Sequence, residues 1–411
     1  MSLRVATTLM LAGGLAGLAS TPARAEIFVQ CPGDLDGDAI PDPEIGPGVP
    51  NPTFQERVRC LHLAAGDGFV NMADGRLQYI FSFSDVTGTF PADVMDVGTL
   101  GANFPAPTIS VDEGDELYLT LTNVGMMVRP DLSDPHTVHW HGFPQAAAIF
   151  DGVPDASVSV NMAASLSYYY NVVEPGTYMY HCHVEATEHM QMGMLGNLYV
   201  RPAQNRLLPG TDLTGFTHQD GFKYAYNDGD GSTYYDVEYP IQIASFDPDF
   251  HDASMTVQPL PFALMKDRYP MLNGRGYPDT INPDPLPPPE ENGFKVSQRV
   301  SSLIEATAGQ KILLRISNLN VTRFYTLATV GIPMKVVGFN ARLLRGPTGE
   351  DLSYETRSVT LGGGEAVDVI LDTDGVTPGT YFLHTTNLNY LSNNEEDFGG
   401  MMTEIRISPA G

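Results

Sequence analysis

The sequence predicts an all-β protein built from two Greek-key β-barrel domains. Short runs of alternating apolar and polar residues recur between turn signals, which is typical of strands. The chain also contains 41 glycines and 32 prolines, a composition that suits many tight turns. One pattern of strands occurs twice along the 411 residues, so we expect two copies of one domain type.

The chain begins with the features of an export signal. Arg4 precedes an apolar run rich in Leu, Ala and Gly, and Ala23-Arg24-Ala25 matches a small-residue cleavage site. We therefore assign residues 1–25 to a signal peptide and expect a periplasmic or extracellular protein. No later stretch is apolar enough to span a membrane. The net charge of −27 opposes binding to nucleic acid and to anionic membranes.

The strand patterns place the domain boundaries. Residues 26–75 are read as an N-terminal extension, and the first domain covers residues 76–202, because the first clear strand pattern begins at Leu77. Residues 203–238 form a polar connector rich in Gly, Asp and Tyr. The second domain covers residues 239–411.

The second domain repeats the first without its histidines. Residues 311–318 match residues 116–123, and residues 378–384 match residues 175–181. His384 is followed by two threonines, however, and no histidine lies between Arg315 and Ile332. We therefore predict that the second domain has no paired metal-binding motif.

Two short segments of the first domain contain the residues with metal chemistry. They contribute His136, His139 and His141 in one segment, and His181, Cys182, His183, His189 and Met194 in the other. A turn and aromatic residues precede the second segment, so we expect residues 181–183 on a strand, with Cys182 facing away from its two neighbours. Sulfur and nitrogen donors with a weak axial methionine suit copper.

This pair of segments resembles the multicopper oxidase branch of the cupredoxin superfamily. The resemblance implies cupredoxin-like folds for both domains and copper as the cofactor. It implies a type 1 copper site made of His136, Cys182, His189 and Met194. It also implies half of a trinuclear type 2/type 3 site made of His139, His141, His181 and His183. Glu185 and Asp151 are the proton donors that this resemblance suggests. One departure is that His189 follows Cys182 by seven residues, where the laccase-like pattern has five.

Cys31 and Cys60 remain once Cys182 is assigned to copper. In an oxidising compartment we expect them to form a disulfide. The loop between them contains four alternating aspartates, Asp34, Asp36, Asp38 and Asp42. This loop resembles the calcium loops of thrombospondin type 3 repeats, and carboxylate oxygens at such positions can converge on Ca²⁺. A solvated acidic loop without a metal explains the same residues, so both interpretations stay open.

Three functions are compatible with these residues. The first is an exported multicopper oxidase that takes electrons from a small-molecule or redox-protein donor and reduces O₂. Two-domain relatives complete the cluster between subunits of a trimer, so a homo-oligomer is expected, with His384 as the added ligand that the repeat favours. The second is a nitrite-reductase-like enzyme. The third is a blue copper electron carrier or copper-binding protein that has no complete cluster.

Overall fold

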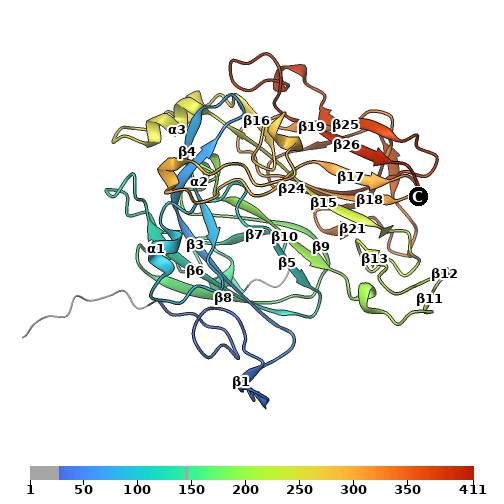
Figure 1. The fold of residues 1–411 in the computed structure, drawn as a ribbon, viewed down its shortest axis with the longest axis horizontal. Helices are drawn as coiled ribbons and strands as arrows, with labels where there is room; N and C mark the ends of the chain where they lie inside the picture. Colours follow the sequence, from blue (N-terminus) through green and yellow to red (C-terminus); the bar gives the residue numbers. More distant parts are fainter. Residues whose placement is uncertain (1–26, 144–146) are drawn as a thin grey trace, which may run out of the picture.

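The computed structural model describes residues 27–143 and 147–411, so the predicted signal peptide lies outside the described residues. Strands dominate and the helices are short, which confirms the all-β prediction (Figure 1). None of the helices in the described part of the chain has the length and apolar character needed to cross a bilayer.

Two four-stranded sheets form the first half of the molecule. Their strand orders are β4-β3-β6-β8 and β5-β10-β9-β7. Apolar side chains from both sheets share one buried core, so the sheets pack face to face. The strands are β3 (Val58–Asn71), β4 (Leu77–Asp85), β5 (Ile109–Asp112), β6 (Glu116–Gly125), β7 (His139–His141), β8 (Ser165–Asn171), β9 (Gly176–His181) and β10 (Leu195–Arg201).

The first half begins earlier in the chain than the strand patterns indicate. Strand β3 lies inside the predicted N-terminal extension, yet it pairs with both β4 and β6. The search for alternating apolar residues does not detect β3. Its buried stretch includes Ala64, Ala65, Gly66 and Gly68, small residues that show no apolar alternation. The boundary expected at residue 76 therefore moves to about Val58.

The second half repeats this arrangement. One sheet has the order β16-β15-β18-β24-β20-β21, with β22 paired to β20, and the other has the order β17-β26-β25-β19-β23. Strands β15, β18 and β24 thus occupy the places of β3, β6 and β8. The strands are β15 (Val237–Phe246), β16 (Tyr269–Leu272), β17 (Ile304–Thr307), β18 (Lys311–Asn318), β19 (Tyr325–Thr329), β20 (Met334–Phe339), β21 (Arg342–Leu343), β22 (Tyr354–Thr356), β23 (Ser358–Leu361), β24 (Glu365–Asp372), β25 (Gly379–Thr385) and β26 (Met402–Ser408).

Short elements fill the connections. The predicted connector is built of two hairpins, β11–β12 and β13–β14, and Cys31 and Cys60 form a disulfide that ties the N-terminal loop to β3. These strands are β1 (Glu44–Gly46), β2 (Val49–Pro50), β11 (Asp212–Leu213), β12 (Phe216–Thr217), β13 (Lys223–Tyr224) and β14 (Tyr234–Tyr235). The helices are α1 (Val94–Gly98), α2 (Ala186–Gln191) and α3 (Pro248–Ser254), with 3-10 turns η1 (Ala148–Phe150), η2 (Ala203–Arg206), η3 (Phe262–Leu264), η4 (Asp279–Ile281), η5 (Glu290–Asn292) and η6 (Leu388–Tyr390).

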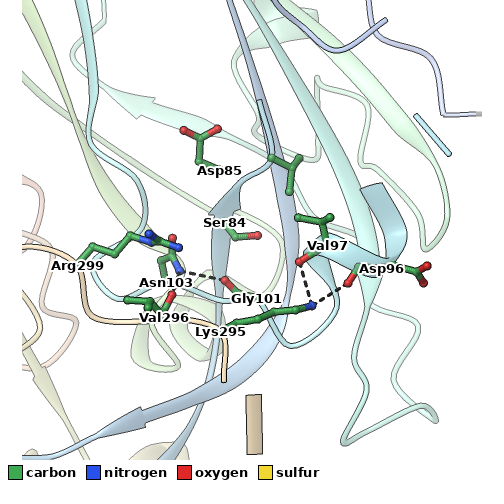
Figure 2. A pocket seen from close by; sticks show the side chains of 10 residues that line it. Ser84, Asp85, Asp96, Val97, Gly101, Asn103, Lys295, Val296 and Arg299 are labelled. Atoms are coloured by element: carbon green, nitrogen blue, oxygen red, sulfur yellow. Dashed lines mark hydrogen bonds between the residues drawn. The ribbon is translucent and has the colours of Figure 1, made fainter. Parts of the chain in front are cut away.

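The two halves are joined by a buried seam. An apolar cluster combines side chains of the first half, such as Met179 and Leu195, with Phe246 and Leu319 of the second. At one edge of the seam, the Lys295 ammonium donates hydrogen bonds to the carbonyls of Asp96 and Val97 in α1 (Figure 2). It also donates to the carbonyl of Thr99 just after this helix. This packing fixes loops of the second half beside the histidines of the first.

Candidate metal centres

Cys182 lies directly after β9, which ends at His181 rather than at His183 as predicted. The alternation of side chains nevertheless continues past the end of the strand. The Cys182 thiol turns into the core, where its Sγ lies 3.2 Å from His189 Nδ1 and 3.7 Å from His136 Nδ1. All three side chains are fully buried. The structure thus brings together three of the four residues expected to form a type 1 copper site.

Helix α2 lies between Cys182 and Met194 and contains His189. The helix brings the His189 ring back to the Cys182 thiol. Met194 is tied to both residues by the backbone, because its N–H donates to the His189 carbonyl at 2.8 Å and its carbonyl accepts from Cys182 N–H at 3.2 Å. The Met194 side chain is fully buried in the same core as Cys182.

The surroundings of Cys182 favour a thiolate. Burial by itself raises the pKa of a thiol, but the imidazoles of His189 and His136 outweigh burial and hold the pKa of Cys182 well below its ordinary value. Burial opposes the charged form of His189, yet Cys182 and Asp134 raise the pKa of His189 to about 10. A buried thiolate facing two imidazole nitrogens is a donor set that suits copper.

The second cluster lies where β7 meets β9. His139 pairs with His181 in the register of these strands, and the Nε2 atoms of His141 and His181 lie 2.9 Å apart. Each of the three rings directs its Nδ1–H to a backbone carbonyl. His181 donates to Cys182 at 2.7 Å, His139 to Asp151 at 2.6 Å and His141 to Gly364 at 3.3 Å.

These hydrogen bonds determine what the cluster can hold. A neutral imidazole that donates through Nδ1 presents an unprotonated Nε2, so the lone pairs of His139, His141 and His181 converge. Burial lowers the pKa of His181 to about 3 and also lowers the pKa of His141, so protonation does not relieve the crowding near neutral pH. A metal cation does relieve it, and nitrogen donors of this kind fit copper.

His183 completes the predicted set of four. Its ring centroid lies 4.9 Å from that of His139 and 5.7 Å from that of His181. The ring borders a cavity of about 510 Å³ that His141 and His181 also line. The four predicted histidines therefore lie together, and none of them belongs to the group formed by His136, Cys182 and His189.

The two predicted proton donors lie in different places. Asp151 is beside the histidine cluster, with its Oδ1 at 3.6 Å from His139 Nδ1. The Glu185 carboxylate groups with Asp134 and His189, with ligand atoms within 4.8 Å of one another. Glu185 has a left-handed backbone at φ 45° and starts α2. Its role as a proton donor stays a prediction.

Sequence reasoning missed Asp134 and Gly364. Asp134 lies two residues before His136, and its carboxylate stands 3.9 Å from His189 Nε2, so an acid next to the histidine motif is a signal that could have found it. Gly364 contacts His141 from the second half of the chain. No local pattern marks such a residue, because its role comes from packing between distant segments.

The repeat explains why the second half has no such cluster. In β19 and β25, Ala328 pairs with His384, as His139 pairs with His181 in β7 and β9. Ala328 therefore occupies the place of His139, and Thr385 that of Cys182. His384 keeps the backbone hydrogen bond of His181, since its Nδ1 lies 2.8 Å from the Thr385 carbonyl oxygen.

The acidic loop gathers three of its four aspartates. Carboxylate oxygens of Asp34, Asp36 and Asp42 lie within 4.8 Å of one another, whereas Asp38 is outside this group. Asp34 accepts hydrogen bonds from the backbone of residues 36, 37 and 39, which folds the loop around its carboxylate. Burial and neighbouring carboxylates raise the pKa of Asp38.

Both halves of the chain match a known protein family. Sequence profiles described as multicopper oxidase match residues 84–205 and 264–405. The multicopper oxidase MCE of Talaromyces pinophilus is 33% identical over 121 residues, which cover 29% of this chain and 19% of that protein. The aligned region thus spans only a small part of that longer relative.

Solved structures share the fold at low identity. The blue copper oxidase from Nitrosomonas europaea has a TM-score of 0.59 and 22% identity, covering 84% of this chain and 85% of that chain. The copper nitrite reductase from Nitrosomonas europaea has a TM-score of 0.55 and 17% identity, covering 85% of this chain and 93% of that chain. Fold similarity of this degree does not separate the two activities.

Proposed function

The chain belongs to the multicopper oxidase family, and from this premise we propose that it is a copper-dependent oxidoreductase that oxidises an external donor and reduces O₂. The donor is a small molecule or a redox protein. The observation that carries the proposal is the presence of two separate donor sets that adjoin along the chain at His181 and Cys182. When bound, copper supplies the one-electron chemistry that neither thiol nor imidazole performs alone.

The protein's own contribution is to connect and orient the two donor sets. His136, Cys182, His189 and Met194 would hold type 1 copper, and His139, His141, His181 and His183 would hold type 2/type 3 copper. Cys182 and His181 are adjacent in sequence, and the His181 Nδ1–H donates to the Cys182 carbonyl at 2.7 Å. The two sets are therefore linked both covalently and by a short hydrogen bond.

Asp151 is the residue that we propose to move protons at the histidine cluster. Its side chain is 39% exposed, and one carboxylate oxygen lies 3.6 Å from His139 Nδ1. A carboxylate that contacts both solvent and the cluster can accept a proton from water and release it inward.

A second candidate function follows from the second half of the chain. Because Ala328 and Thr385 replace the ligands of the repeat, the described residues of one chain offer four clustered histidines and no second set. A blue copper electron carrier or copper-binding protein needs only the Cys182 site. The nitrite-reductase-like alternative ranks below both, because that family carries an acid at the place of His139.

We also propose an exported location and a bound calcium ion. Periplasmic or extracellular export follows from the predicted signal peptide and agrees with the disulfide. Calcium at Asp34, Asp36 and Asp42 is supported by the convergence of their oxygens, which are ligands that Ca²⁺ prefers.

Copper counting with optical and EPR spectroscopy tests the proposed function. We expect the wild type to show intense visible absorption from a copper–thiolate bond together with additional copper. In Cys182→Ser the visible band and donor oxidation should disappear, while copper at the histidine cluster remains. A blue wild type with a single copper per chain would identify the electron carrier instead, and retained colour in Cys182→Ser would remove the assignment of the thiolate.

A further inference from the structure

A buried histidine of the second half contacts the copper loop, the segment 182–194 that carries three of the four proposed type 1 ligands. His251 lies in α3 and is fully buried, with its ring centroid 4.4 Å from that of Phe246. Its Nδ1 lies 2.5 Å from the Tyr79 carbonyl oxygen, and its Nε2 lies 2.9 Å from the Gln191 carbonyl oxygen. Tyr79 belongs to β4 and Gln191 ends α2, so the ring connects three segments that are distant in sequence (Figure 1).

Both ring nitrogens of His251 face carbonyl oxygens, which only accept hydrogen bonds. A neutral imidazole has one N–H and donates to one of the two carbonyls, whereas the protonated ring donates to both. Burial lowers the pKa of His251, although the two carbonyls and the carboxylates of Asp247 and Asp267 act in the opposite direction. In either form the ring donates at least one hydrogen bond across this contact.

The position of β4 explains why such a contact is needed. This strand is at the edge of its sheet, so its outward backbone groups need partners from outside the sheet. The copper loop supplies one of them, because the Phe81 N–H donates to the Met192 carbonyl at 3.0 Å. At Tyr79, two residues earlier on the same strand, His251 stands between the strand and the loop and contacts both.

The side chain of Gln191 is also held by the second half. It is buried, and its Nε2 donates to Asp267 Oδ1 at 3.4 Å. The other oxygen of Asp267 accepts a hydrogen bond from the Ser245 hydroxyl, which fixes the carboxylate. Gln191 therefore contacts the second half through its backbone and through its side chain. It lies two residues after His189 and three before Met194, so its position constrains both.

We propose that His251 is a positioning residue for the type 1 copper site, because its two contacts fix Gln191 and thereby the place of the His189 ring beside the Cys182 thiol. The proposal rests on the proposed function for the identity of the metal. It adds a residue of the second half that acts on the site through the backbone of the copper loop. Partners of this kind orient metal ligands, so they affect both the affinity for the metal and its electronic properties.

Spectroscopy of copper-loaded variants tests the proposal. His251→Leu removes both contacts, and we expect it to weaken copper binding at the thiolate site about tenfold and to shift the visible bands, the EPR signal and the reduction potential. His251→Gln keeps an N–H donor and should change these quantities less. The control is His218→Leu, because His218 is also buried but contacts the Tyr224 hydroxyl at 2.9 Å, away from the copper loop. The control should match the wild type.

Hydrogen exchange of the copper-free protein measures the positioning of the loop without the metal. The amides of Met192 and Met194 donate to the carbonyls of Glu188 and His189 at 2.8 Å, so we expect them to be protected in the wild type. In His251→Leu they should exchange about tenfold faster, as loss of one or two hydrogen bonds predicts. His251→Gln provides the same comparison if the leucine variant does not fold.

The two experiments separate this proposal from the proposed function. Unchanged spectra and unchanged exchange in a folded His251 variant would overturn the positioning role, as would equal changes in His218→Leu. Fast exchange of the two amides in the copper-free wild type would also overturn it. A wild type that binds no copper would instead refute the proposed function, and hydrogen exchange would still decide whether His251 fixes the loop.

Discussion

The Nδ1 atom of His141 lies 3.3 Å from the carbonyl oxygen of Gly364, although 223 residues separate the two in sequence. Gly364 has φ +88°, and a Cβ added to it would lie 2.7 Å from the His141 ring. The second half of the chain thus orients a histidine of the first half, and it does so through a position where only glycine fits.

We predict that Gly364→Ala disturbs the histidine cluster without affecting the Cys182 site. The methyl group must push the His141 ring away, so copper at the cluster should fall while the visible thiolate absorption stays. Gly349→Ala is the matched control, because Gly349 has a similar φ of +94° with nothing within 4 Å of its added Cβ. Loss of cluster copper in both variants would point to general strain rather than contact with His141.

Sequence patterns predict the parts of this protein that depend on local order. The repeat of residues 116–123 in 311–318 corresponds to β6 and β18, and the spacing of the histidines predicts which rings lie together. The patterns do not predict strand β3, because its small residues show no alternation of apolar and polar side chains. They also do not predict the contact of Gly364 with His141. The patterns likewise do not indicate that the Glu185 carboxylate groups with Asp134 and His189, because this placement depends on the fold of the chain after His183.

Acid should destabilise the protein partly through His62. This histidine is fully buried with its Nε2 at 2.7 Å from Thr122 Oγ1, and burial lowers its pKa from 6.5 to about 4. His62 therefore binds a proton below about pH 6.5 in the unfolded chain but only below about pH 4 in the folded protein. Stability is full above that window and falls with pH inside it, by about 2 kcal/mol between pH 7 and pH 5.

Urea unfolding of copper-loaded wild type and His62→Gln at these two pH values checks this contribution. All other titratable groups are common to the two proteins, so the difference between the two isolates His62. The variant should lose about 2 kcal/mol less than the wild type on acidification. Equal losses would show that His62 titrates normally.

Arg315 is the central cation of the seam between the halves. It is fully buried, its Nε donates to Glu238 at 3.0 Å, and its Nη1 lies 3.2 Å from Thr177 Oγ1 and 3.7 Å from Asp368. Arg315→Met would leave Asp368 buried without its cation, so we expect a loss of about 3–5 kcal/mol in unfolding free energy. Adding Asp368→Asn should recover part of this loss.

A surface arginine provides the comparison for Arg315. Arg406 pairs with Glu404 at 2.8 Å but its side chain is 41% exposed, so Arg406→Met should cost no more than about 1 kcal/mol. Chemical denaturation at pH 7 measures all three variants. Similar losses for Arg315→Met and Arg406→Met would contradict the role of the buried network.

Chelation should lower the melting temperature if calcium binds the acidic loop. A ligand bound only by the folded state adds about 2.7 kcal/mol at a hundredfold excess over Kd. The response should vanish in Asp36→Ala, measured at fixed copper occupancy. Identical melting with and without chelator would leave a solvated acidic loop.

A second loop of the chain supplies the control for calcium. Asp228 accepts the backbone N–H groups of Asp230, Gly231 and Thr233, the same offsets at which Asp34 accepts its hydrogen bonds. Here Arg345 already pairs with Asp230 at 2.6 Å. Asp230→Ala should therefore leave the chelator response unchanged.

The last prediction concerns how the histidine cluster is completed. In the proposed assignment the four histidines of the first half supply half of a trinuclear site. Ala328 and Thr385 show that the second half lacks the paired ligands at the matching positions of the repeat. We expect a complete cluster to require a subunit interface, with His384 as the added ligand, because it keeps the strand position and the backbone hydrogen bond of His181. Copper is counted on separated monomer and oligomer, in the wild type, in His384→Ala and in the control His218→Gln. Full copper occupancy of the cluster in a monomer would contradict completion at an interface. The same conclusion would follow if His384→Ala left the copper content and oxidase activity of the oligomer unchanged.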